Sequence, residues 1–208
     1  MVPQDAAAAH PAPSPGAVIG PNALLQLDPL LRAAGLAAPV YAEAGVAGMP
    51  DGTGMINEAP VARVHRALRQ LAPEAAPALA REAGVGTGRY ILAHRIPRPA
   101  QTLLKTLPWW LSARLLARAI AANAWTFAGS GKFMVISPYC FELRNNPLVS
   151  GETSTKPLCD WHCGVFSTLY AALVHPEMRC IETACCAAGD PACRFELARD
   201  TGGVTRRP

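Results

Sequence analysis

Charged side chains are scarce and scattered in this chain. Only 16% of its 208 residues are Asp, Glu, Lys or Arg, and the formal net charge is +4. Proteins that bind nucleic acids normally gather Lys and Arg into a stripe or patch, because phosphate contacts dominate their affinity. No such cluster is present, so nucleic acid is not expected among the partners. With half of its residues hydrophobic, a chain of this length is expected to bury a substantial core.

Two kinds of membrane-directing segment are also missing from the sequence. Residues 1–16 lack the positive cluster and apolar run of a secretion signal. The best candidate for a membrane span, residues 103–127, is interrupted by three charges and a proline, namely Lys105, Pro108, Arg114 and Arg118. We therefore expect a cytoplasmic protein in which this stretch is available for peripheral contact with a membrane surface.

Signatures of nucleotide-dependent redox chemistry and of nucleophilic catalysis are absent as well. The nearest match to Gly-x-Gly-x-x-Gly is Gly84-Val-Gly86-Thr-Gly88. Its spacing differs and it follows a helical stretch, so we interpret it as a loop. No Gly-x-Ser-x-Gly occurs, and Gly129-Ser130-Gly131 is interpreted as a turn between a helix and a strand. We therefore predict no catalytic residue.

Hydrophobic periodicity predicts helices first and strands later. The predicted helices are residues 21–35, 58–71 with Asn57 as cap, 73–83 ending at Gly84, 87–96, 101–127 as one helix or two divided at Pro108, and 159–174. The predicted strands are residues 132–144, bent near Pro138, then 178–186 and 193–197. This order predicts an α+β fold with an antiparallel sheet. Residues 21–128 would be its helical N-terminal part and residues 129–199 its core, with tails over residues 1–20 and 200–208.

Cysteine is the residue type that stands out. Six of the seven cysteines lie between Cys159 and Cys193. An odd number without a secretion signal indicates metal binding or buried thiols rather than disulfides. Three cysteines without ligand spacing are interpreted as buried apolar groups or bystanders: Cys140, Cys180 and Cys186.

The remaining cysteines predict a metal site at the end of a hairpin. Glu182 and Cys185 flank the end of one predicted strand, and Cys193 begins the next one after a tight turn. Cys159 starts a predicted helix, where the partial positive charge favours a thiolate, and would supply the fourth ligand. Three thiolates and a carboxylate suit tetrahedral zinc, and four protein ligands make such a site structural. Cys163, one helical turn further on, is the alternative to Cys159.

The spacing of these residues resembles that of a known domain family. The quoted elements are Cys159 with Gly164, Glu182-x-x-Cys185, and Gly189-Asp190-x-x-Cys193-x-Phe195. They resemble the motif of the 4-vinyl reductase domain family over residues 133–197. Similar domains occur in phenol-sensing bacterial regulators, where the matching Cys, Glu, Cys and Cys bind zinc and a ligand pocket lies between the zinc-bearing part and the helices. The resemblance implies zinc, a homodimer, and a relation to the fold of vesicle-tethering subunits.

A narrower resemblance covers most of the chain. Residues 95–97, 124–131 and 159–162 resemble the J-protein family of bacteriochlorophyll biosynthesis. That family was first named as a divinyl protochlorophyllide 8-vinyl (4-vinyl) reductase, and has since been discussed as a carrier of Mg-tetrapyrrole intermediates. The resemblance implies Mg-protoporphyrin, its monomethyl ester or divinyl protochlorophyllide as ligand. It also implies the large subunit of magnesium chelatase and the following methyltransferase as partners, near the photosynthetic membrane.

Three functions stay open at this point: a carrier, a reductase with an external reductant, and an interaction module without a small ligand. A carrier needs a large apolar pocket, basic groups for propionates and an axial ligand. The candidate pocket residues are Trp109, Trp110, Trp125, Phe127 and Phe133, with Arg89, His94 and Arg95 for the carboxylates. The candidate axial ligands are His65, His94, His162 and His175, of which His162 could instead support the zinc site. Each of these residues also has an ordinary interpretation as core or surface.

Overall fold

The computed structural model describes residues 16–200 and combines helices with an antiparallel sheet. The helices are α1 (Asn22–Leu25), α2 (Asp28–Ala33), α3 (Ala37–Ala44), α4 (Glu58–Leu71), α5 (Ala76–His94), α6 (Arg98–Thr106), α7 (Trp109–Ala122) and α8 (Asp160–Leu173). The short 3₁₀ helices are η1 (Ala124–Thr126), η2 (Pro147–Val149) and η3 (Cys186–Ala188). The strands are β1 (Val18–Ile19), β2 (Ile56–Asn57), β3 (Lys132–Ser137), β4 (Cys140–Arg144), β5 (Met178–Ala184) and β6 (Cys193–Arg199). The α+β class predicted from the sequence is confirmed.

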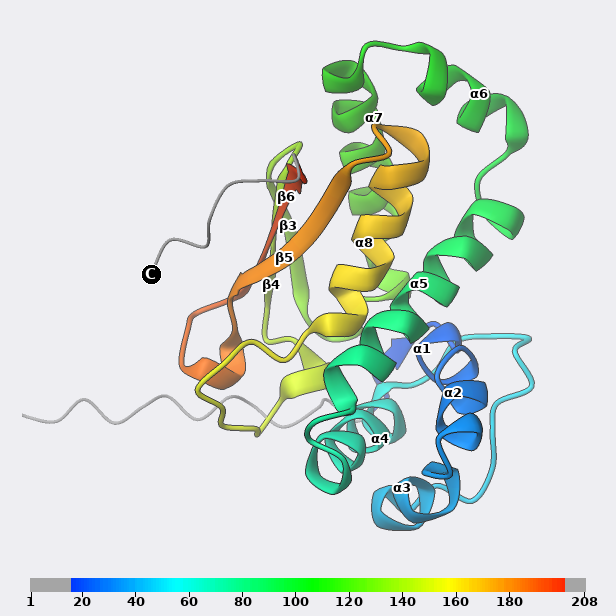
Figure 1. Ribbon diagram of the computed structural model, residues 1–208, viewed down its shortest axis with the longest axis vertical. Coiled ribbons are helices and arrows are strands. Elements are labelled where there is room, and N and C mark those ends of the chain that lie inside the picture. Colours follow the sequence, from blue (N-terminus) through cyan, green and yellow to red (C-terminus); the bar gives the residue numbers. More distant parts are fainter. Residues whose placement is uncertain (1–15, 201–208) are drawn as a thin grey trace, which may run out of the picture.

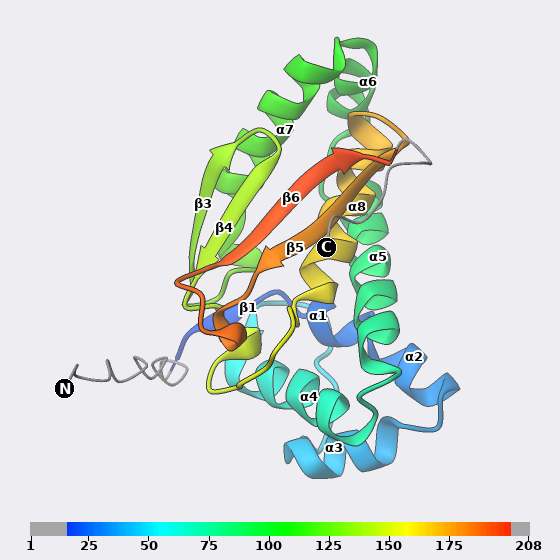
Figure 2. The same cartoon turned by 60° about the vertical axis from the view of Figure 1, so that its left-hand side comes forward.

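The main sheet has the strand order β3-β4-β6-β5, with every neighbouring pair antiparallel. One face packs against α8, as Figure 2 shows. Side chains alternate along β6, where Cys193, Phe195 and Leu197 are buried, as the period-two pattern predicts. The opposite face is polar, and Arg194 there lies 2.8 Å from Glu142 and 3.2 Å from Glu196.

Helix α8 forms the centre of the molecule because it lies between the sheet and α5 (Figure 1). Glycines bring the two helices unusually close. A Cβ on Gly84 would lie 2.1 Å from the carbonyl oxygen of Trp161, and one on Gly164 would lie 2.2 Å from that of Arg81. Real Cβ atoms do not approach backbone atoms so closely, so both positions require glycine. This contact explains Gly164 of the sequence motif.

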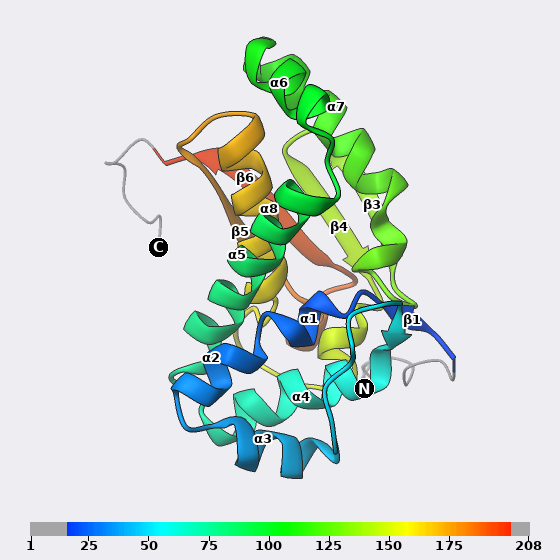
Figure 3. The ribbon, with the colours of Figure 1, turned by 90° about the vertical axis from the view of Figure 1, so that its right-hand side faces the viewer.

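The N-terminal helices α1–α4 gather at the end of the molecule where α8 begins (Figure 3). Asn57 caps α4 by accepting a hydrogen bond from the Ala59 backbone N–H at 2.8 Å, as predicted. Glu58 is fully buried and accepts hydrogen bonds from Ser130 N and Oγ, both at 2.6 Å. Gly129, with φ +57°, leaves room for that carboxylate. The predicted turn at residues 129–131 is confirmed, and the buried bonds fix it against α4.

Helices α6 and α7 project beyond the other end of α8 (Figures 1 and 3). Pro108 is the N-cap of α7, so residues 101–127 form two helices, the second of the alternatives that the sequence left open. Across residues 16–200, no helix has both the length and the apolarity that crossing a bilayer requires.

Three sequence predictions are wrong. Gly84-Val-Gly86-Thr-Gly88 is neither a loop nor a helix end but the middle of α5, because contact with α8 outweighs the low helix propensity of glycine. Residues 132–144 do not form one bent strand: they reverse after Ser137 into the β3–β4 hairpin. The expected tail over residues 1–20 contains β1, which pairs with β2; residues 1–15 and 201–208 lie outside the described residues.

Candidate metal centre and adjoining cavity

The four predicted metal ligands come together in space. The ligand atoms of Cys159, Glu182, Cys185 and Cys193 all lie within 4.8 Å of one another. The Sγ atom of Cys193 is 3.5 Å from that of Cys159 and 3.9 Å from that of Cys185. Thiolates arranged tetrahedrally at about 2.3 Å from zinc lie about 3.8 Å apart. These separations therefore fit a metal ion, and they are much longer than the roughly 2.05 Å of a disulfide.

The backbone at this end of the β5–β6 hairpin explains the Gly-Asp part of the motif. Gly189 has φ +91°, a conformation that strongly favours glycine. The Asp190 carboxylate accepts a hydrogen bond from the Cys185 backbone N–H at 2.8 Å. Together they fold residues 185–192 back so that Cys193, the first residue of β6, faces Cys185. Cys159, the N-cap of α8, completes the set from the neighbouring helix.

Burial at the cluster leaves one oxygen atom without a partner. Glu182 Oε2 accepts a hydrogen bond from the Cys159 backbone N–H at 2.7 Å. Its Oε1 atom is buried and has no hydrogen-bond partner within the described chain. A buried carboxylate oxygen is costly in that condition, and a cation would satisfy it. The donor set thus fits zinc, although zinc binding itself stays a proposal.

The electrostatics of the cluster depend on which thiol ionises first. Hydrogen bonds from the Cys159 and Cys193 thiols lower the pKa of Cys185. Burial raises the pKa of Cys159. Burial, followed by the charge of Cys185, raises the pKa of Glu182 to about 8. Without a cation the cluster therefore resists holding several negative charges, and a divalent ion would reverse this by favouring every deprotonated ligand.

The rival ligand Cys163 lies elsewhere. It is buried against Cys180, and a hydrogen bond between the two thiols, together with burial, raises the pKa of Cys163. Cys186 contacts the Leu143 carbonyl through its Sγ atom at 3.9 Å, while its backbone N–H donates to Cys193 Sγ at 3.4 Å. The geometry thus brings Cys159, rather than Cys163, to the cluster.

Asn146 is a supporting residue that sequence reasoning missed, since Asn-Asn-Pro indicated only a turn. Its side chain is 1% exposed. The Nδ2 group donates to Cys159 Sγ at 3.1 Å and to Cys193 Sγ at 3.5 Å, while Oδ1 accepts from the Leu148 N–H at 3.1 Å. Amide donors to thiolate sulfur offset the negative charge of a cluster of this kind and orient the ligands.

Replacing Asn146 by aspartate should weaken zinc affinity about 10- to 100-fold. Aspartate retains an acceptor for Leu148 N–H, but puts a carboxylate where the sulfur atoms now receive a donor. Competition with a chromophoric chelator would measure the change. Exposed Asn123→Asp serves as a control, and equal affinities of the two variants would contradict the supporting role.

A cavity adjoins the metal cluster on the side of α4 and α5. Its volume is about 330 Å³ and its walls are mostly apolar. The lining residues used below are His65, Leu68, Arg69, Lys156 and Leu158. A second cavity of about 370 Å³ shares Arg69 and Leu158 with it and is more polar. Because Leu158 directly precedes Cys159, both cavities border the metal-binding segment.

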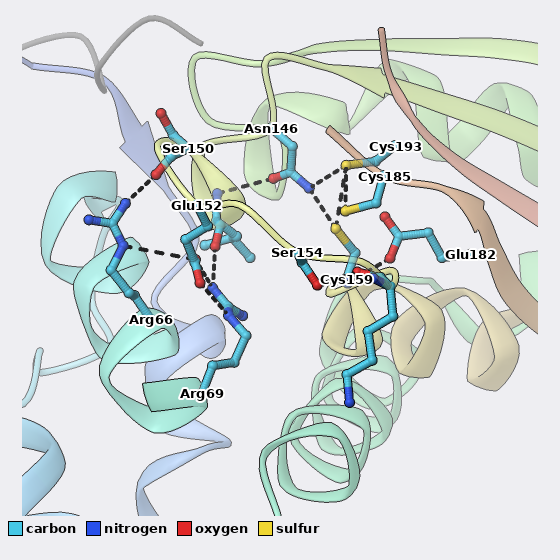
Figure 4. A network of polar contacts seen from close by, with 12 residues as sticks. Arg66, Arg69, Asn146, Ser150, Glu152, Ser154, Cys159, Glu182, Cys185 and Cys193 are labelled. Carbon is cyan, nitrogen blue, oxygen red and sulfur yellow. Dashed lines mark hydrogen bonds and ion pairs between the residues drawn. The ribbon is translucent and has the colours of Figure 1, made fainter. Parts of the chain in front are cut away.

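Polar contacts connect this region to α4, as Figure 4 shows. Arg69 donates to both carboxylate oxygens of Glu152, and to the Leu148 carbonyl at 2.7 Å. Arg66 donates to the Ser150 carbonyl. Residues 146–152 therefore bind the arginines of α4 at one end and the cluster sulfurs, through Asn146, at the other.

Of the four candidate axial histidines, His65 borders a cavity. It is 1% exposed, and its Nε2 lies 3.2 Å from the Ala23 carbonyl, which leaves Nδ1 for a ligand. Burial, and then the nearby Arg69 charge, lowers the pKa of His65 to about 3, so the ring is neutral. His162 is instead packed among aromatic rings, with Phe195 at 5.4 Å. His94 is exposed, and the His175 Nδ1 atom accepts from the Glu177 N–H at 3.3 Å.

The aromatic residues predicted to line a flat pocket are dispersed. Trp109 and Trp110 begin α7 and are 45% and 48% exposed, whereas Trp125 in η1 is 59% exposed. Phe127 is buried in the core, 5.0 Å from Phe133. His94 and Arg95 contact Tyr90 at the end of α5, and Arg89 lies 3.7 Å from Glu82. None of these residues lines either cavity beside the metal cluster.

Comparison with known proteins agrees with this combination of sheet, helices and cysteine cluster. The 4-vinyl reductase domain matches residues 140–199, the segment that carries β4, α8 and the hairpin. The chain belongs to the family of the bacteriochlorophyll synthase 23 kDa chain. It is 55% identical to that protein from Cereibacter sphaeroides, over 86% of this chain and 89% of the relative, and 44% identical to that from Rhodobacter capsulatus, over 86% of each. The resemblance to the 4-vinyl reductase domain family is confirmed.

Solved structures share the fold at low identity. An H-NOX protein mutant from K. algicida superposes with a TM-score of 0.52 at 9% identity, covering 88% of this chain and 98% of that one. A second H-NOX structure gives 0.50 at 9% identity, covering 91% and 100%. At this identity the likeness concerns the fold alone.

Proposed function

We propose that this protein binds an Mg-tetrapyrrole intermediate of bacteriochlorophyll biosynthesis, Mg-protoporphyrin or its monomethyl ester or divinyl protochlorophyllide, and delivers it between enzymes. The observation that carries the proposal is the family relationship at 55% identity over most of the chain. It supports an accessory role in bacteriochlorophyll biosynthesis. The fold likeness adds support, since heme distortion has been studied in the H-NOX family and heme is a tetrapyrrole.

The cavity beside the metal cluster is the part of the molecule that best suits such a ligand. Leu68 and Leu158 offer apolar walls. Lys156 and Arg69 at its border can meet propionate groups, and neutral His65 can offer Nδ1 to magnesium. At about 330 Å³ the first cavity is at the lower end of the range for ligand pockets. The macrocycle would therefore enter by one edge and extend over the second cavity.

The zinc ion belongs to the same proposal as a structural element. Bound by Cys159, Glu182, Cys185 and Cys193, it would have no open coordination position. It would hold the start of α8 against the hairpin and so fix Leu158 at the border of the cavity. We retain the large subunit of magnesium chelatase and the following methyltransferase as the proposed donor and acceptor, and a homodimer as the proposed state.

Titration of the metal-analysed full chain with Mg-protoporphyrin and its monomethyl ester, followed by absorbance, tests the proposal. We expect saturable binding of one pigment per chain. His65→Gln keeps an N–H donor for the Ala23 carbonyl but removes the free ring nitrogen, and should weaken binding at least about tenfold, or 1.4 kcal/mol. Exposed His94→Gln should bind like the unchanged protein.

The same titration distinguishes the other functions. A vinyl-to-ethyl spectral change of a divinyl substrate on addition of NADPH would make the protein a reductase. Absence of saturable binding, with retained capture of a chelatase subunit, would make it an interaction module. Either result would overturn the carrier proposal. Binding unaffected by His65→Gln would overturn the assignment of the cavity.

A further inference from the structure

The charge of the chain is uneven in a way that total composition hides. Between Glu82 and Glu142 the sequence contains no acidic residue, but it contains seven Lys and Arg residues. Helices α6 and α7 lie wholly inside this segment. Arg98 and Lys105 are exposed on α6, and Arg114 is exposed on α7. None of the ion pairs described for residues 16–200 involves these three cations. The α6–α7 hairpin, residues 98–122, is therefore uniformly positive.

The same hairpin exposes large apolar side chains. Leu103 is 55% exposed, Trp109 45% and Trp110 48%. The inner face is different: Leu104 and Leu116 are buried, and Ser112 Oγ donates to the Leu104 carbonyl at 2.6 Å. The exposed group thus belongs to the outer face of a well-packed hairpin. It projects past the sheet and α8, as Figures 1 and 3 show.

Exposed tryptophans among unpaired cations have a specific physical preference. An indole ring is amphipathic and favours the headgroup region of a bilayer. Lys and Arg beside it are attracted to anionic lipid, with about 1 kcal/mol for each basic residue near the surface. The guanidinium of Arg114 lies 5.6 Å from the Trp110 ring centroid, so charge and ring act at one place. No acidic side chain within the hairpin opposes the attraction.

We propose that the α6–α7 hairpin docks this protein on the surface of an anionic lipid bilayer. Leu103, Trp109 and Trp110 enter the headgroup region, and Arg98, Lys105 and Arg114 meet lipid phosphates. A second copy of the chain is a poorer occupant, because a twofold contact through this hairpin would set like charges against each other. The proposal is independent of the pigment, since the metal cluster and its cavity lie at the opposite end of α8 (Figure 1).

Co-sedimentation of the full chain with vesicles tests this surface. Vesicles of phosphatidylcholine alone are compared with vesicles containing phosphatidylglycerol. We expect at least about tenfold tighter binding to the anionic vesicles, weakened by salt. Trp109→Ala with Trp110→Ala, and separately Arg98→Glu with Lys105→Glu, should each reduce binding at least about tenfold. Tryptophan emission should shift to shorter wavelength in the unchanged protein.

Matched controls lie outside the hairpin. Trp125→Ala removes the most exposed tryptophan, and Arg144→Glu reverses an exposed cation on β4; both should bind anionic vesicles normally. Circular dichroism and metal content verify that the variants fold. Failure of the unchanged protein to bind, or equal binding by the Trp109/Trp110 and Trp125 variants, would overturn the proposal. So would a dimer that dissociates in the Trp109/Trp110 variant while vesicle binding persists, since the face would then be an interface between copies.

Discussion

Cys193→Ser protein should carry less than about a tenth of a zinc ion per chain and lose about 4 kcal/mol or more of unfolding free energy. Cys193 contacts both other sulfurs, at 3.5 and 3.9 Å, and is fully buried. Serine is a far weaker zinc ligand, and its loss would leave Cys159, Glu182 and Cys185 as buried, partly charged groups without a cation. Because most domains have only about 5–15 kcal/mol in total, much of this protein should unfold.

The measurement is metal content by mass spectrometry together with denaturant unfolding of the full chain. Cys163→Ser is the matched control, because Cys163 is equally buried on the same helix but lies apart from the cluster. It should keep one zinc ion. If Cys163→Ser lost zinc while Cys159→Ser retained it, the ligand set would be wrong. If Cys193→Ser matched the unchanged protein in stability, the metal would have no structural role.

Gly84→Ala should destabilise the fold by about 3 kcal/mol, although alanine favours an isolated helix by about 1 kcal/mol. The new Cβ would lie 2.1 Å from the Trp161 carbonyl oxygen and 3.0 Å from Gly164 Cα. Both neighbours are backbone atoms of α8, so the helices must separate. The start of α8 carries Cys159, and we therefore expect lower zinc affinity as well. Thermal and denaturant unfolding would measure the loss.

Gly86→Ala on the same helix is the control. A Cβ there would meet the side-chain oxygen of Gln26 at 2.7 Å, and this side chain can move aside. The variant should be as stable as the unchanged protein or slightly more stable. Equal destabilisation by Gly84→Ala and Gly86→Ala would mean that helix flexibility, rather than the contact between α5 and α8, decides the outcome.

The sequence predicted the features that local chemistry determines. Period-two burial in β6, the Asn57 cap and the helix start at Pro108 follow from neighbours along the chain, and all three are confirmed. The spacing of Glu182, Cys185 and Cys193 identified a cluster because one hairpin holds them all.

Features that depend on distant contacts were not predictable in this way. Gly84 lies within a helix because α8, far along the chain, requires a small residue there. Asn146 becomes a donor to sulfur only when the ends of β4 and β6 meet. The cavity at His65 forms between α4, α5 and residues 156–160, which no local pattern connects.

The contact between α5 and α8 has a consequence for the order in which the chain acquires structure. During synthesis, residues 76–94 leave the ribosome well before residues 160–173 exist. Until then the glycine-lined side of α5 has no partner, and the sheet lacks β5 and β6. Residues 160–199 therefore complete a hydrophobic core that the earlier helices only begin, so the domain cannot close until the ribosome has passed β6.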